Sequence, residues 1–318
     1  MEAMKQHYVG PNDTIEVEES LLVLAPMHAE ASEKIESKNT SFWREAWINL
    51  RKNKLAIAGL VFIVGIVIMS IIGPYLNGGA DYAAQDLANS SQLPNGTDWF
   101  GTDDIGRSLW VRTWYGARIS LFIAVTVAMI ELAIGTTYGG ISGFYGGTLD
   151  IVMQRISEII SSIPSLVLLT LLLVVFKPSI PTIIFAVSFT SWVGMSRVVR
   201  SQILKYKEYE FILAARTLGA SNGRLIFKHL VPNVVGQLIV VVSFSIPSTI
   251  FFESFLAFLG LGLPAPLPSL GILISDGFKS MLLYPHMLLI PALVLTALMI
   301  SFNLLGNGLR DAFDPKMK

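Results

Sequence analysis

Six apolar stretches, each about long enough to cross a bilayer, constrain this 318-residue chain more than any other feature. A spanning helix needs about 20 mostly apolar residues, because backbone polar groups in hydrocarbon must be satisfied internally. The stretches are Leu55–Ile72, Ile119–Tyr138, Ile159–Phe176, Ile180–Ser196, Val234–Phe252 and Met281–Leu305. Prolines inside three of them, at positions 164, 247 and 291, predict kinks rather than breaks. The sequence therefore predicts an all-α polytopic membrane protein with six transmembrane helices.

The composition agrees with a chain that lies mostly in lipid. Hydrophobic residues make up 53% of the chain and charged residues 14%, whereas soluble domains are about 25% charged. This balance argues against a disordered chain, a nucleic-acid binder and an ordinary soluble enzyme. The absence of cysteine excludes disulfides, thiolate metal sites and a cysteine nucleophile.

The net charge of zero hides an uneven distribution of charge along the chain. Residues 1–40 hold eight acids and three bases and lack the order of a secretory signal, so we predict a disordered acidic cytosolic tail. With the N-terminus inside, fourteen Lys and Arg residues lie near span ends on the inner side and five on the outer side. The positive-inside rule then predicts that both termini are cytoplasmic, including a short tail over residues 311–318.

The segment before the first span is amphipathic. Trp43, Ala46, Trp47 and Leu50 fall on one helical face, and basic residues fall on the opposite face. This pattern predicts an elbow helix in the membrane interface, with tryptophan rings at headgroup depth. The alternative is that the first span simply starts early.

Glycines at positions 135, 139, 143 and 147 recur every four residues. If the helix of the second span continues through them, they form a smooth strip against which another helix can pack closely. The same glycine density is also typical of a tight turn on the inner side. Both interpretations stay open.

Enzyme signatures are missing from the sequence. It contains no GxxxxGK[ST] loop and no HExxH motif, and its four histidines lack ligand spacing, so we expect neither ATP hydrolysis nor a metal centre in this chain. Glu131 and Glu253 stand alone inside spans, which favours structural or cavity-lining roles over a proton relay. Arg155 and Glu158, three residues apart, predict an ion pair on a helix surface.

The inner connection between the fourth and fifth spans, about residues 201–233, is long, basic and helical in pattern. Residues Glu208–Gly219 predict a short helix that Gly219 ends. The helical pattern places Tyr209, Ile212, Leu213 and Arg216 on one side of it. A second helix, Ser221–Leu230, is expected to close at Val231-Pro232-Asn233. A short apolar-faced helix on the cytosolic surface is typical of an element that docks into a partner's groove.

A motif in this connection resembles the cytoplasmic EAA loop of ATP-binding-cassette (ABC) importer permeases. It reads Leu213-Ala214-Ala215-Arg216-Thr217-Leu218-Gly219, followed by His229-Leu230-Val231-Pro232-Asn233. The family loop reads Glu-Ala-Ala, three residues, Gly, nine residues, then Ile-x-Leu-Pro, and the spacing from Gly to Pro is kept here. The departures are Leu213 for Glu, His229 for Ile and Val231 for Leu, so a salt bridge at the acidic position is not expected.

Four further stretches narrow the resemblance to the second, C-type permease subunit of the dipeptide/oligopeptide/nickel branch. They are Phe42–Leu55; Trp99–Ser108 with Tyr115–Leu121; Ser162–Leu166; and Glu253–Gly262. The resemblance implies the type I importer fold. The elbow, first transmembrane helix and external loop then occupy residues 41–116, and a core permease domain with five transmembrane helices occupies residues 117–310.

The resemblance also implies partners and a function. The helix at Glu208–Gly219 would be the coupling helix, seated in a groove of an ATPase. Its coupling residues would be Glu208, Tyr209, Ile212, Leu213, Ala214, Ala215, Arg216 and Gly219. The implied partners are a second, different permease, two cytosolic ATPases that bind ATP and Mg²⁺, and an extracytoplasmic peptide-binding protein. The implied location is the cell membrane of a prokaryote. We expect this chain to bind no nucleic acid and no cofactor of its own.

The implied cargo is peptide, most readily oligopeptide, with dipeptide or nickel as alternatives within the branch. Two rivals come from other classes. An ion-coupled secondary transporter would need paired intramembrane carboxylates or broken helices in two matching halves, and the sequence shows neither clearly. A membrane scaffold would use the coupling-type loop only as a docking site.

Overall fold

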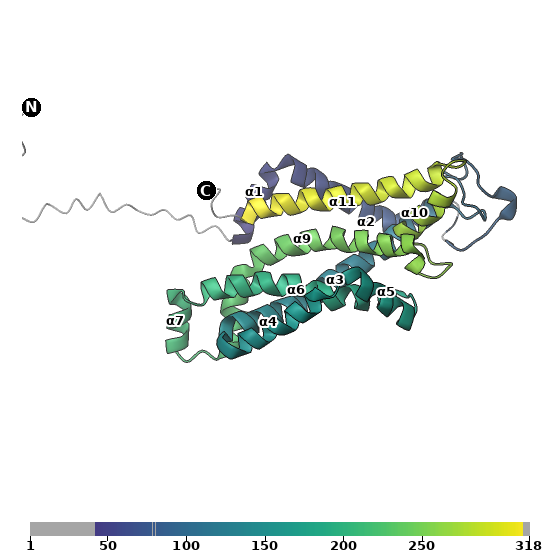
Figure 1. The fold of residues 1–318 in the computed structure, drawn as a ribbon. Helices are drawn as coiled ribbons and strands as arrows, with labels where there is room; N and C mark the ends of the chain where they lie inside the picture. Colours follow the sequence, from purple (N-terminus) through teal and green to yellow (C-terminus); the bar gives the residue numbers. More distant parts are fainter. Residues whose placement is uncertain (1–41, 78, 80, 314–318) are drawn as a thin grey trace, which may run out of the picture. The chain divides into compact units, whose positions relative to one another are not determined.

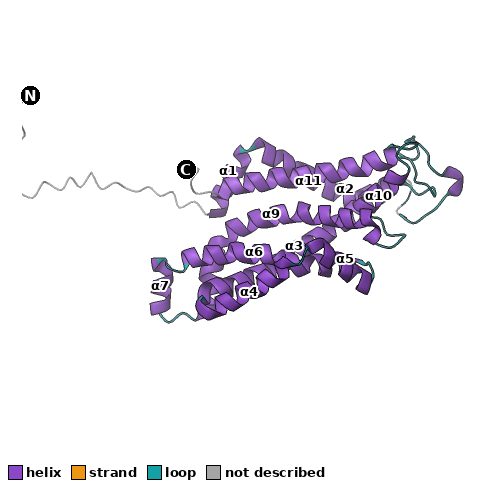
Figure 2. Ribbon diagram, viewed as in Figure 1, coloured by secondary structure: helices purple, strands orange, loops and turns teal. Residues whose placement is uncertain are grey.

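The computed structural model describes residues 42–77, 79 and 81–313, and the regular structure within these ranges is helical (Figures 1 and 2). The predicted acidic tail over residues 1–40, and residues 314–318 of the predicted C-terminal tail, lie outside the described residues. Five helices of the described part are long and apolar enough to cross a membrane, and a sixth span is obtained if one sharply bent pair of helices counts as one. The all-α polytopic fold is thereby confirmed.

Two helices separated by one residue begin this bundle. α1 covers Phe42–Lys52 and α2 covers Lys54–Leu76. Asn53 caps α2, because its side-chain oxygen accepts a hydrogen bond of 3.1 Å from the N–H of Ala56 and so satisfies one of the free donors at the helix start. The first span therefore does not extend back through α1, and α2 runs beyond its predicted end at Ile72.

α3, Leu109–Tyr145, and α6, Ile180–Tyr206, pack together along most of their lengths. Gly135, Gly139 and Gly143 lie along this contact, because a Cβ atom built on any of them would come within 3.0 Å of an atom of α6. The helix of the second span thus continues through these three glycines, and they form the smooth strip. The predicted boundary between residues 116 and 117 falls inside α3, where the helix is unbroken.

The chain reverses direction after α3 and enters α4, Gly147–Ser162. Gly146 and Gly147 have φ angles of 65° and 58°, in the left-handed region that favours glycine. The fourth glycine of the pattern therefore belongs to a turn and not to the packing strip. Each of the two interpretations of the glycines holds for part of the segment.

The third predicted span, Ile159–Phe176, is broken rather than kinked. It is divided between α4 and α5, Ser165–Phe176, which meet at an angle of 77°. Ile163 has extended backbone angles (φ −78°, ψ 124°), since the ring of Pro164 disfavours a helical conformation in the residue before it. The expectation that the helix would only kink at Pro164 is wrong.

The fifth span begins earlier than predicted. α8 (Asn222–Arg224), a π-helical turn η3 (Leu225–Leu230) and α9 (Val231–Leu256) follow one another without a break, and the helix continues through a second π-helical segment, η4, Ala257–Leu261. The stop expected at Val231-Pro232-Asn233 is wrong. Pro232 stands directly after the π-helical turn η3, and local π-helical adjustment is one way in which a proline is accommodated inside a membrane helix.

The sixth span starts later and ends later than the predicted Met281–Leu305. α11 covers His286–Phe313 and so includes residues 311–313 of the predicted tail. A turn, closed by a hydrogen bond of 2.8 Å from the N–H of Tyr284 to the carbonyl of Ser280, precedes it. Before this turn lies α10, Leu270–Lys279, a short helix that the sequence analysis did not predict.

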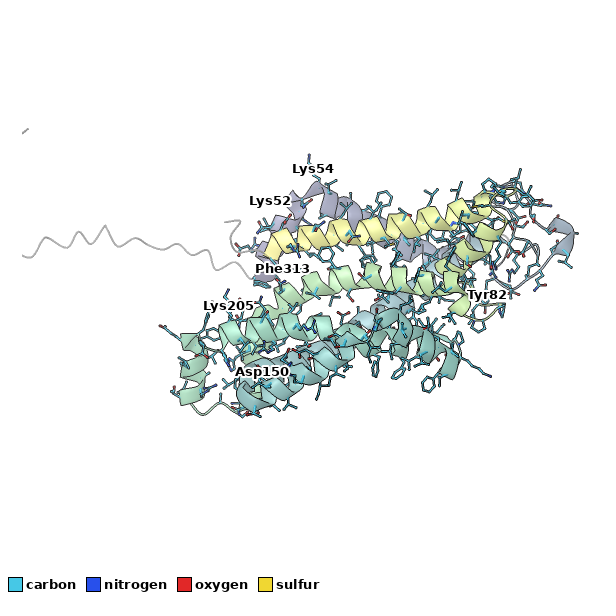
Figure 3. All side chains as sticks on the ribbon, in the orientation of Figure 1. Lys52, Lys54, Tyr82, Asp150, Lys205 and Phe313 are labelled. Atoms are coloured by element: carbon cyan, nitrogen blue, oxygen red, sulfur yellow. The ribbon has the colours of Figure 1, made fainter. Side chains whose placement is uncertain are left out.

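The two ends of the described chain lie together. The rings of Phe42 in α1 and Phe313 in α11 stack with their centres 5.5 Å apart. Figure 1 shows α7, Glu210–Thr217, at this same end of the long helices, and α10 at the opposite end. Figure 3 separates the labelled residues in the same way, with Phe313 and Lys205 at the first end and Tyr82 at the second.

Candidate functional site

α7 lies crosswise at the end of the bundle (Figure 1), and in the chain it follows α6 and precedes α8. α6 continues past its predicted end at Ser196, and the carbonyl of Tyr209 accepts the first hydrogen bond of α7, 2.9 Å from the N–H of Ile212. Gly219 has a φ angle of 82°, a left-handed conformation that ends many helices. The short helix expected over Glu208–Gly219 is therefore present as α7, with Gly219 as its stop.

Ile212 attaches α7 to the bundle. Its side chain has no exposed surface and belongs to an apolar cluster that also contains Phe144 of α3, Ile203 of α6 and Leu225 of η3. Burial of a side chain of this size contributes about 1.5–3 kcal/mol. The sequence analysis placed Ile212 among the coupling residues, on the same side as Leu213. Ile212 packs into the bundle instead, because the ends of α3 and α6 offer it an apolar environment. It is therefore not part of the outward surface of α7.

The outward side of α7 presents apolar side chains. Tyr209, Phe211 and Leu213 are 41%, 42% and 44% exposed, and Leu218, one residue after the helix, is 88% exposed. A grouped set of exposed apolar side chains marks an interaction surface. We call these four residues the α7 apolar surface.

The remaining coupling residues of the predicted set divide by position. Glu208, Ala214, Arg216 and Gly219 are exposed, whereas Ala215 is partly buried against the Ile212 cluster. Phe211 and Leu218 were absent from the predicted set. The helical period would have indicated Phe211 once Ile212 was assigned to the inward side, since neighbouring residues of a helix point about 100° apart.

Two basic side chains tie this end of the molecule to α3. The guanidinium of Arg216 lies 5.6 Å from the centre of the Phe144 ring, a cation–π distance. The ammonium of Lys207 donates a hydrogen bond of 3.2 Å to the carbonyl of Gly143. Carbonyl groups in the last turn of a helix attract positive charge. Arg216 of α7 and Lys207, which precedes α7, thus both contact the end of α3.

An ion pair joins α4 to α6 near the same end (Figure 3). Arg200 donates two hydrogen bonds to Asp150, at 2.6 and 2.5 Å, and Ser142 of α3 donates a third at 2.5 Å. Bidentate pairs of this kind are among the strongest hydrogen bonds in proteins. The sequence analysis missed this pair because its partners are 50 residues apart. The predicted pair of Arg155 and Glu158 is confirmed at 2.7 Å, with both side chains more than half exposed.

Each of the two carboxylates inside spans is held by a serine of another helix. Glu253 in α9 is 1% exposed and accepts a hydrogen bond of 2.9 Å from Ser120 of α3. Glu131 in α3 is 6% exposed and accepts a hydrogen bond from Ser245 of α9. Both bonds join α3 to α9, and Glu131 also lines a cavity.

Sequence similarity places the chain in a class. Residues 135–318 match the family of binding-protein-dependent transport system inner membrane components. Residues 41–94 match the N-terminal transmembrane domain of oligopeptide transport permease C. Because the first match covers more than half of the chain, the chain belongs to this family. It is a multi-pass membrane component of an ABC importer with the type I fold, and not the subunit that hydrolyses ATP.

Individual relatives are similar over nearly the whole chain. The oligopeptide transport system permease protein OppC of Bacillus subtilis (strain 168) is 46% identical over 294 residues, which cover 92% of this chain and 96% of the relative. The dipeptide transport system permease protein DppC of the same organism is 42% identical over 309 residues, covering 97% and 96%. OppC of Escherichia coli (strain K12) is 43% identical over 287 residues, covering 90% and 95%. The resemblance to the peptide branch of importer permeases is thereby confirmed.

Proposed function

We propose that this chain is one of two different permease subunits of an ATP-driven peptide importer and forms half of its path through the membrane. The observation that carries the proposal is α7. It is a short helix at the end of the bundle, attached through Ile212 and exposing the α7 apolar surface, and it contains the stretch that resembles the EAA loop. Permease relatives named for oligopeptide and dipeptide transport support peptide as the cargo.

In this proposal α7 and both termini lie in the cytosol, as the excess of inner basic residues supports. Two ATPase subunits bind ATP and Mg²⁺ and receive the α7 apolar surface, so this chain itself carries no cofactor. A binding protein delivers the peptide at the opposite end of the bundle, where α10 lies. Nucleic acid has no part in the process.

The contacts of α7 suggest how ATP drives the permease. ATP binding draws the two ATPases together and carries α7 with them. Because Ile212 and Arg216 join α7 to the ends of α3 and α6, the displacement shifts the inner ends of both helices. The permease pair is then tipped from an inward-facing to an outward-facing state, a rigid-body change biased by contacts that the permease does not itself energise.

The match of residues 41–94 to oligopeptide permease C supports oligopeptides over dipeptides or nickel as the preferred cargo. A competition assay, in which unlabelled compounds inhibit the uptake of a labelled peptide, distinguishes these three cargoes. We expect unlabelled penta-alanine to inhibit uptake of a labelled tripeptide more strongly than di-alanine does, and Ni²⁺ to leave it unchanged. Uptake of nickel with no uptake of peptide would assign the importer to another cargo.

The proposal is tested by mild-detergent affinity purification of this chain from native membranes, with mass spectrometry of its partners. We expect two ATPase chains and one different permease for each copy. Leu213→Asp places a charge on the α7 apolar surface and should remove the ATPases while keeping the second permease. Asn222→Asp adds the same charge to an exposed polar position of the same connection and should keep both. Recovery of the wild-type chain alone, or as a homodimer, would favour a secondary transporter.

A further inference from the structure

A cavity of about 340 Å³ lies among α3, α5, α6 and α9. Its volume is near the lower end of small-molecule sites, about 300–1,000 Å³. Polar side chains make up more than half of its lining residues. They are Glu131, Ser165, Thr190, Ser191, Ser245, Ser248 and Thr249. A lining this rich in oxygen is unusual for helices that cross a membrane, since lipid offers hydroxyl groups no hydrogen bonds.

Glu131 is the charged residue of this lining. It stands 22 residues after the start of α3 and 14 before its end, about 33 and 21 Å at 1.5 Å per residue, so it lies deep within the membrane-spanning part of the helix. Ser245 donates one hydrogen bond to its carboxylate, and lysine, arginine and histidine are absent from the described residues around the cavity. A carboxylate at this depth attracts a positive charge that the cavity itself does not supply.

The hydroxyl groups around Glu131 are available to a further partner. The Oγ atom of Ser191 is buried and makes no hydrogen bond within the described part of the chain. Ser248 is exposed at the cavity wall, and its hydroxyl donates a hydrogen bond of 3.0 Å to the carbonyl of Phe244, so its oxygen can still accept one. Carboxylate and hydroxyl oxygens together accept the three hydrogen bonds that an ammonium group donates.

We propose that this cavity receives the positively charged amino group of a peptide in transit, with Glu131 as its counter-charge and the neighbouring hydroxyl groups as additional acceptors. The proposal rests on the function proposed above, because it assumes that peptides pass this part of the permease. Phe244 and Phe252 supply the apolar part of the wall, against which a peptide side chain of any type can lie. The cavity would therefore recognise the charge of the peptide's amino group without selecting among peptide side chains.

Cysteine chemistry in the assembled complex tests the cavity directly. The chain has no cysteine, so Ser248→Cys introduces a single thiol whose modification on this chain is followed by mass spectrometry. A thiosulfonate reagent that carries trimethylammonium is compared with one that carries sulfonate, with and without ATP. Adding Glu131→Gln should lower the ratio of cationic to anionic reaction rates about fivefold or more, the effect of one unit charge at about 4 Å in water.

Glu131→Asp is the matched variant, because it shortens the side chain, and so disturbs the hydrogen bond with Ser245, but keeps the charge. The amide of Glu131→Gln still accepts that bond, so the two variants separate charge from structure. We expect Glu131→Asp to keep a reagent ratio close to that of the wild type. An unreactive thiol in both states, or a ratio that Glu131→Gln leaves unchanged, would overturn the proposal.

ATP-driven uptake of tri-alanine by the same reconstituted complexes completes the test. We expect Glu131→Gln to slow uptake about fivefold or more, and Glu131→Asp to keep most of the wild-type rate. Equal losses in the two variants would show a structural role for Glu131 and overturn the inference. Wild-type complexes that take up no peptide would instead overturn the proposed function, whereas wild-type uptake that Glu131→Gln leaves unchanged would overturn only the cavity proposal.

Discussion

Replacing Gly139 with alanine tests the packing that holds the centre of the bundle together. A Cβ atom at this position would lie 2.8 Å from the Cβ of Val199 and 3.0 Å from the backbone nitrogen of Arg200, and closer still to the carbonyl oxygen of Ser196. Non-bonded carbon atoms prefer separations of about 3.5–4.0 Å. Because backbone atoms are among the neighbours, a side-chain rotation cannot relieve the overlap, and α3 and α6 must separate locally by about 1 Å.

Overpacking of this kind costs about 1–3 kcal/mol. Because the overlap involves backbone atoms, we expect a cost in the upper part of this range, about 2–3 kcal/mol; the higher helix propensity of alanine returns up to about 1 kcal/mol, which leaves a net loss of about 1–2 kcal/mol. One kcal/mol shifts the Tm of a domain of 150–250 residues by about 2–4 °C, so we expect the apparent Tm to fall by about 2–8 °C. The assay is thermal unfolding of the purified complex in detergent, followed by tryptophan fluorescence at one scan rate.

Gly194→Ala is the matched control on the partner helix. A Cβ atom at Gly194 meets no other atom within 4 Å, so the same substitution in α6 should leave the apparent Tm unchanged or raise it slightly. Equal Tm values for Gly139→Ala and Gly194→Ala would refute the close approach of α3 and α6.

Two further predictions concern the end of the bundle that carries α7. Gly219 has open space around it but a φ angle of 82°, so strain and not a clash limits substitution. Gly219→Val should lower ATP-driven uptake roughly tenfold, while the protein stays in the membrane. Asparagine tolerates this backbone conformation, so uptake by Gly219→Asn should stay within twofold of the wild-type rate. Wild-type uptake by the valine variant would contradict the coupling geometry. Asp150→Ala leaves Arg200 without its partner in a site where the Asp150 side chain is 12% exposed, and should cost about 2 kcal/mol of stability in the thermal assay. Arg155→Ala breaks an exposed pair and should leave the stability almost unchanged. Equal losses of stability in the two variants would contradict the conclusion that the pair of Asp150 and Arg200 holds α4 against α6.

The apolar runs located the candidate membrane spans of the described residues, which are five single helices and one bent pair, because the mean hydropathy of about 20 residues depends on whether a helix lies in lipid or in water. Helix ends were harder to predict. Pro164 breaks a helix, whereas Pro232 and Pro247 lie inside one continuous helix. The difference depends on which neighbouring groups satisfy the freed carbonyls, and this is a property of tertiary packing.

The position of α7 was predictable from its charge, length and stop residue, whereas the orientation of its side chains was not. Ile212 and Leu213 are both apolar, and one is buried while the other is 44% exposed. In a helix of eight residues with apolar side chains on several sides, the pattern alone cannot tell the face that packs on the bundle from the face that meets a partner. The pairing of Asp150 with Arg200, and of Glu131 with Ser245, was equally out of reach, because each joins residues far apart in the chain.

The measurement that tests the central claim most directly is uptake of a labelled oligopeptide by proteoliposomes that contain this chain with its second permease, both ATPases and the binding protein. We predict uptake that requires ATP and the binding protein, persists when ion gradients are collapsed, and is lost when Leu213→Asp uncouples α7 from the ATPases. Uptake driven by a proton or sodium gradient without ATP would contradict the account.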